Sequence, residues 1–128
     1  MFPTELTRRS FQASNGEFGW SREDARIAIS ILIQEQRAIL GGELWWVSDG
    51  ARDWTGLIPQ RHGPDAVYSW DTKRASGEEW ASFVVRCADE SLQAIDRWPG
   101  IDDLPSNLAG RILYNLTWVS ETEYGDLK

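Results

Sequence analysis

Residues 77–98, with the sequence GEEWASFVVRCADESLQAIDRW, separate into one apolar and one charged face when they are placed on an α-helix. The apolar face carries Trp80, Phe83, Val84, Cys87, Ala88, Ser91, Ile95 and Trp98. Ser76 and Glu79 have the spacing of a capping box, and Pro99-Gly100 predicts the end of the helix. A helix of this kind has to bury its apolar face against another element, so the segment predicts a surface helix lying on a sheet.

A second predicted helix begins after Ser21, which forms a variant of the capping box with Asp24. Gly41-Gly42 predicts its end, with Leu40 as the last helical residue. The segment from Ala25 to Ile39 is apolar except for one narrow polar stripe. A helix this apolar must be covered on more than one side, either by the N-terminal segment or by a second copy of the chain in a homodimer.

Three strands are predicted at 43–48, 66–72 and 111–121, and a fourth at 53–58 is expected to pair with 66–72 across the PQRHGP loop. The order of elements is then α-β-β-β-α-β. Short connections favour antiparallel pairing. We therefore predict an α+β fold, a single domain over residues 1–128 with about four strands in a mainly antiparallel sheet and two long helices packed mainly on one face. Residues 1–20 are poorly patterned, but Asn15-Gly16 predicts a small hairpin between 8–13 and 17–20.

The strand at 43–48, ELWWVS, carries two adjacent tryptophans, Trp45 and Trp46. Neighbouring residues on a strand point to opposite faces of the sheet, so both faces receive a large ring. We expect Trp46 to lie in the core with Leu44 and Trp45 to lie on the outer face, with the reverse arrangement left open. An outer tryptophan would be covered by the N-terminal segment, or it would mark a partner surface or a ligand groove.

The net charge of the chain is −7, and no run of lysine and arginine forms a basic stripe. Binding to phosphate backbones depends on such a stripe, so nucleic acid is not an expected partner. A strongly acidic protein is instead steered toward basic protein partners. The sequence shows no signal peptide and no apolar run long enough to cross a membrane, so we expect a cytoplasmic protein without membrane contact. Its excess of arginine over lysine is typical of a GC-rich bacterial coding sequence.

Candidate catalytic chemistry is sparse. His62 is the only histidine, and it precedes Asp65 by three residues in a loop, which is the minimum for a general base and its orienting carboxylate. The single cysteine, Cys87, excludes an intramolecular disulfide. The carboxylate pairs do not have the spacing of a metal site, and no glycine-rich phosphate loop is present. We therefore expect neither a metal nor a cofactor.

Three functions follow from these features. The first is a small acidic interaction protein without catalytic activity, such as an inhibitor or an immunity protein; in size and charge the chain is similar to many bacterial toxin-immunity proteins. The alternative is a small-molecule binder, for example of carbohydrate, with a tryptophan-lined pocket. The third is an enzyme that uses His62 and Asp65. The candidate binding residues are Trp45, Trp46, Trp54, Arg61, His62, Tyr68 and Trp70.

Overall fold

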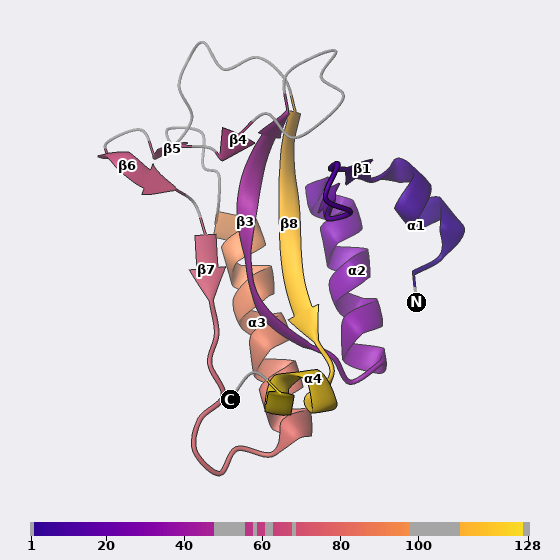
Figure 1. The fold of residues 1–128 in the computed structure, drawn as a ribbon, viewed down its shortest axis with the longest axis vertical. Coiled ribbons are helices and arrows are strands. Elements are labelled where there is room, and N and C mark those ends of the chain that lie inside the picture. The colour runs from indigo at the N-terminus through magenta and orange to yellow at the C-terminus, as the bar shows by residue number, and fades with distance from the viewer. Residues whose placement is uncertain are drawn as a thin grey trace.

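The fold is centred on two long antiparallel strands, β3 (Ala38–Val47) and β8 (Arg111–Val119), which pair from one end to the other (Figure 1). The structure is a computed structural model that describes residues 2–47, 56–57, 59–60, 63–67, 69–97 and 111–126. It describes side chains for 2–47, 69–97 and 112–126. The α+β class expected from the sequence is confirmed, and the sheet is open and antiparallel.

The sheet is wider than predicted. Its order is β1-β2-β8-β3-β4, and β7 also pairs with β3, whereas β5 and β6 form a separate two-stranded sheet. The bounds of these strands are Phe11–Gln12 for β1, Phe18–Trp20 for β2, Gly56–Leu57 for β4, Pro59–Gln60 for β5, Gly63–Val67 for β6 and Ser69–Asp71 for β7.

The predicted pairing of 53–58 with 66–72 is wrong, because β4 and β7 both pair with β3 instead. Trp45 and Trp46 pair with β4, and residues 41–43 pair with β7. The physical reason is the length of β3, whose ten residues leave room for two short strands one after the other along the same edge. The strand was expected to begin at residue 43, and a shorter strand would not have offered this second position.

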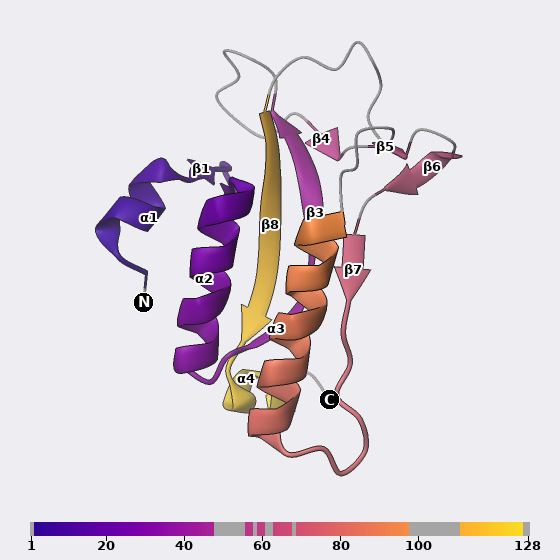
Figure 2. The same cartoon turned by 180° about the vertical axis from the view of Figure 1, so that it is seen from behind.

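Two long helices, α2 (Arg22–Gln34) and α3 (Trp80–Arg97), lie side by side on one face of the sheet (Figure 2). Two short helices, α1 (Thr4–Arg9) and α4 (Glu121–Asp126), were not predicted because six residues are too few to show a helical period. The main core lies between the long helices and the sheet. It contains Leu32 of α2, Phe83 and Ile95 of α3, and Leu44 and Tyr114 of the central strands.

The predicted end of the first long helix at Leu40 is wrong, because α2 ends at Gln34 and residues 38–40 already belong to β3. The end is a Schellman motif in which the Arg37 N–H donates to the Leu32 carbonyl and the Gln36 N–H donates to the Ile33 carbonyl. Gln36 takes the left-handed position with a φ of 56°. Glycine is the usual residue at this position, so a glutamine gives no stop signal in the sequence, and the later Gly41-Gly42 pair indicates a stop that the structure does not have.

Helix α3 begins at Trp80, three residues later than predicted, and the Ser76–Glu79 capping box does not form in the structure. Instead the Glu78 side chain accepts a hydrogen bond from the Ala75 N–H at 2.9 Å, across a turn in which Gly77 has a φ of 76°. The buried face of α3 is otherwise as predicted as far as Ile95. Trp98 lies outside the described residues.

The N-terminal segment contacts the start of α2, which is one of the two alternatives for this apolar helix, but the cover is incomplete and Ile27 of α2 is 41% exposed. Leu6 of α1 is 2% exposed in the main core, and the Arg9 guanidinium binds the Asp24 carboxylate through two hydrogen bonds of 2.9 and 3.0 Å. The predicted hairpin is present as β1 and β2, and its turn contains Gly16 with a φ of 90°. In the part of the chain that the structure describes, no helix is long and apolar enough to cross a membrane.

Candidate functional site

The tryptophan pair of β3 divides between the two faces of the sheet as expected. Trp46 contacts the main core on the helix side, where Leu44 is fully buried. Trp45 belongs to a second, smaller cluster on the opposite face, together with Phe11, Ala13, Val47 and Leu113. We refer to this opposite face as the outer face of the sheet.

Trp45 is not on the molecular surface, because the N-terminal hairpin folds over it and leaves 2% of the residue exposed. Phe11 of β1 meets the indole edge to face, with ring centroids 6.5 Å apart. The indole N–H donates to a Glu43 carboxylate oxygen at 2.8 Å, so its polar group is also satisfied. The ring is therefore a structural link between the hairpin and the sheet.

Trp70 lies on the helix side of the sheet, away from Trp45. Its indole N–H donates to the Ser91 hydroxyl of α3 at 3.0 Å. Its six-membered ring lies against Gly42, where an added Cβ would come within 2.5 Å of two ring carbons. Trp45 and Trp70 thus do not converge on one pocket. The side chains of Trp54, Arg61, His62 and Tyr68 lie outside the described residues, as does that of Asp65.

The remainder of the outer face forms a shallow cavity of about 390 Å³, which we call the outer-face groove. Its lining consists of Glu17, Leu40, Gly41, Gly42, Glu43, Ser69, Trp70, Asn115 and Thr117. Gly41, which shares the outer face with Glu43 and Trp45, contributes no side chain to the groove. A Cβ on Gly41 would collide with the main-chain oxygen of Trp70, so close pairing with β7 requires glycine at this position.

The outer-face groove is acidic. Glu17 and Glu43 supply its only charges among the described residues, and its lining contains no lysine or arginine. Both carboxylates are held by neutral donors: Glu17 accepts from the Asn15 side chain at 2.7 Å, and Glu43 accepts from Trp45. Several carboxylates elsewhere pair with arginine, as Asp24 does with Arg9 and Glu90 with Arg86, whereas Glu79 and Asp89, just before and within α3, have no such pair among the described residues. Among the described residues, no lysine or arginine of the groove lining neutralises this negative charge.

A second cavity, of about 310 Å³, adjoins the groove and is called the edge cavity. It lies beside β8 and is lined by Asn15, Gly16, Glu17, Phe18, Leu116, Thr117 and Trp118. Glu17 and Thr117 line both cavities, so the two are neighbours. The edge cavity differs from the groove in its apolar walls, which come from Phe18, Leu116 and Trp118.

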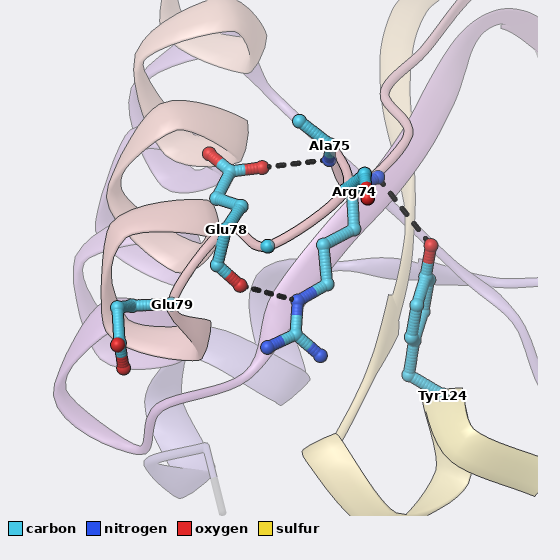
Figure 3. Close-up of a pocket in the computed structure, with 7 residues that line it drawn as sticks. Arg74, Ala75, Glu78, Glu79 and Tyr124 are labelled. Carbon is cyan, nitrogen blue, oxygen red and sulfur yellow. Dashed lines mark hydrogen bonds between the residues drawn. The ribbon is translucent and has the colours of Figure 1, made fainter.

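A third cavity, of about 550 Å³, lies where the chain enters α3 (Figure 3). Its walls are joined by hydrogen bonds: Arg74 donates through Nε to the Glu78 carbonyl at 2.8 Å and through its main-chain N–H to the Tyr124 hydroxyl at 3.4 Å. Arg86 donates hydrogen bonds to both Glu78 carboxylate oxygens. These bonds, together with the hydrogen bond from the Ala75 N–H, lower the pKa of Glu78 to about 2. These contacts hold α4 and the loop at residues 74–78 against the start of α3, so their role is structural.

No group of three or more histidine, cysteine, aspartate or glutamate side chains within the described residues could hold a metal ion. Cys87 is fully buried on α3, and burial raises the pKa of its thiol to about 12, which makes it a poor nucleophile at neutral pH. His62, the one candidate general base, lies outside the described residues.

Comparison of the chain with protein-family models, with curated proteins and with solved structures found no match. Sequence reasoning missed Glu17, Glu43, Asn115 and Thr117 as site residues, since none belongs to a catalytic or ligand-binding motif; Asn115 and Thr117 match only an N-x-T glycosylation acceptor. The available signal was alternation: Glu43 and Trp45 share one face of β3, and Asn115 and Thr117 share one face of β8.

Proposed function

We propose that the protein is a small non-catalytic interaction protein that binds a basic segment of a protein partner in the outer-face groove. The observation that carries the proposal is the pair of carboxylates, Glu17 and Glu43, in a groove without a lysine or arginine in its described lining. A lysine or arginine of a partner would supply the missing charge, and the net charge of −7 would steer such a partner toward the protein.

The shape of the groove supports a macromolecular partner over a small molecule. It is shallow, its floor is the main chain of Gly41 and Gly42, and its polar groups line a sheet face instead of converging on an enclosed point. Small-molecule sites are usually concave, mostly apolar and enclosing. An inhibitor, an immunity protein or an assembly subunit would all use a surface of this kind.

The test is capture of partners on immobilised protein from a lysate of the organism that encodes it, with three baits compared by mass spectrometry. The baits are the wild type, the double variant Glu17→Gln/Glu43→Gln, and a control, Asp89→Asn/Glu121→Gln. The control changes the net charge equally, but its two residues are exposed on α3 and α4. Glutamine at position 43 keeps an oxygen that accepts from Trp45, so the variant preserves the local structure.

The expected result is a basic protein that the wild type and the control retain at low ionic strength and that the groove variant binds roughly three- to tenfold more weakly, as expected for two partly exposed ion pairs. Retention should fall as salt is added. If the groove variant and the control lose the same proteins to the same extent, general charge is responsible and the groove is not the binding site.

A further inference from the structure

One edge of β8 is paired over only part of its length. Strand β3 pairs with residues 111–119 on one side, whereas β2 pairs on the other side only with Tyr114 and Asn115. Within the described part of the chain, no strand pairs with residues 116–119 on the side away from β3. The main-chain groups that point outward along such an edge are available to an added strand.

The open edge is a built feature of the hairpin. The register of β2 on β8 would bring Phe18 opposite Leu116, but Phe18 pairs with Gln12 of β1 and takes part in no pair with β8. The Asn115 side chain, which is 3% exposed, donates to the Phe18 carbonyl at 2.9 Å. The Phe18 carbonyl, at the first residue of β2, thus accepts from a side chain of β8. The residues before it, in β1, fold over the outer face.

The two faces of this edge have different chemistry. On the helix side, Phe18 and Trp118 are partly buried against the main core and present apolar surface. On the outer side, Thr117 is exposed, and the Glu17 carboxylate lies in the same cavity. Successive side chains of an added strand would alternate between these two faces. One set would contact Phe18 and Trp118, and the other would lie beside Glu17.

We propose that the edge of β8 at residues 116–119 accepts an extended segment of the partner in which apolar and basic residues alternate. The segment adds as a strand, with main-chain hydrogen bonds to β8, apolar side chains in the edge cavity and basic side chains facing Glu17. This inference rests on the proposed function and names how the same partner is bound.

Charge decides between a basic partner and a second copy of this chain. Two copies joined edge to edge at β8 would bring their Glu17 carboxylates into the same region, and each copy carries a net charge of −7. Like charges placed together oppose association, whereas a basic segment neutralises the same groups. The edge cavity has no lysine or arginine in its described lining that would change this balance.

The test uses the whole protein and a synthetic heptapeptide in which lysine and valine alternate. Two control peptides accompany it: the same sequence with alternate main-chain nitrogens methylated, and the same residues arranged as a lysine block and a valine block. Binding is measured by titration calorimetry, and amide hydrogen exchange of residues 111–119 is followed by NMR. Light scattering with and without the peptide reports self-association.

With the alternating peptide at about ten times its Kd, exchange should slow about tenfold at every second amide of residues 116–119, because about nine-tenths of the protein is then occupied. The methylated and block peptides should bind more weakly and should not protect these amides. Glu17→Gln should weaken the alternating peptide more than Asp89→Asn does.

Three results would overturn the inference: no binding of the alternating peptide, equal binding of the methylated peptide, or binding without protection of residues 116–119. Protection of these amides by self-association in the absence of peptide would assign the edge to a second copy. If capture of a partner still depends on Glu17 and Glu43 in any of these cases, the proposed function stands and only the strand addition fails. Loss of that dependence overturns the proposed function itself.

Discussion

Trp45 lies directly over Gly19, and a Cβ at position 19 would come within 2.9 Å of the Cε3 atom of the indole. The same Cβ would come within 3.2 Å of the Leu113 Cβ. The glycine in β2 therefore lets a ring from β3 reach across β8 to the hairpin. This contact joins strands that are not neighbours in the sheet, and it explains why the outer tryptophan is covered by the chain itself.

The variant Gly19→Ala should destabilise the protein by about 1–3 kcal/mol, because neither the buried ring nor the strand backbone has space to move away. Urea unfolding at neutral pH measures the change. Gly125→Ala in α4 is the matched control, since a Cβ there meets nothing within 4 Å. Equal stability of Gly19→Ala and the wild type would mean that the ring does not lie over the glycine.

Substitution of the two tryptophans of β3 by alanine should destabilise the protein to different extents, and the larger loss is expected for Trp45 on the outer face. Trp45→Ala should cost about 3–5 kcal/mol, the range for deleting a fully buried aromatic side chain. Trp46→Ala should cost less because its ring is partly exposed. Trp45→Ala should also speed hydrogen exchange at the Ala13 amide, which donates to the Glu17 carbonyl in the hairpin. A larger loss for Trp46→Ala would contradict the burial of Trp45.

Gln36 is the non-glycine residue with a positive φ at the end of α2. Gln36→Gly should stabilise the protein by about 0.5–1 kcal/mol, since relief of the left-handed strain exceeds the entropy that glycine adds to the unfolded chain. The Gln36 carbonyl still accepts from the Trp80 indole at 2.7 Å in this variant. The control is Ser30→Gly on the exposed side of the same helix, which should lower stability. Thermal or urea unfolding of both variants gives the comparison.

The sequence predicts well the parts of the fold that depend on periodicity. The buried face of α3, the antiparallel sheet and the opposite placement of Leu44 and Trp45 all follow from periods of 3.6 and 2. Prediction from the sequence fails where a residue occupies a local conformation that its residue type rarely adopts. Gln36 ends a helix in a position that usually belongs to glycine, and Gly41 and Gly42 lie within a strand, where they usually mark a break.

The candidate site was only partly predictable for a related reason. A large apolar residue on the outer face is visible in the sequence, but its cover depends on which distant segment folds over it, and a two-residue strand such as β1 has no readable pattern. The acidic character of the whole chain was evident. The location of the Glu17 and Glu43 carboxylates in one groove could not be predicted, because it depends on how distant segments of the chain come together in the fold.

The pKa of Glu78 gives the fold a defined response to acid. Hydrogen bonds from Arg86 and from the Ala75 N–H lower this pKa from 4.5 to about 2. Because the folded pKa lies below the unfolded one, the stabilisation is fully present above pH 4.5 and is lost as the pH falls toward 2. Glu78→Gln should therefore lower the free energy of unfolding at neutral pH, and the difference from the wild type should shrink across this acidic range.

Urea unfolding of both proteins at several pH values measures that difference, so the titration of all other carboxylates cancels. Glu79→Gln serves as the control because Glu79 is the exposed neighbour of Glu78 and has no ion pair to arginine or lysine among the described residues. Its difference from the wild type reports the loss of a carboxylate at this position without loss of the contact to Arg86. A Glu78→Gln difference that stayed constant down to about pH 2 would show that the carboxylate does not hold Arg86 and the start of α3 together in solution.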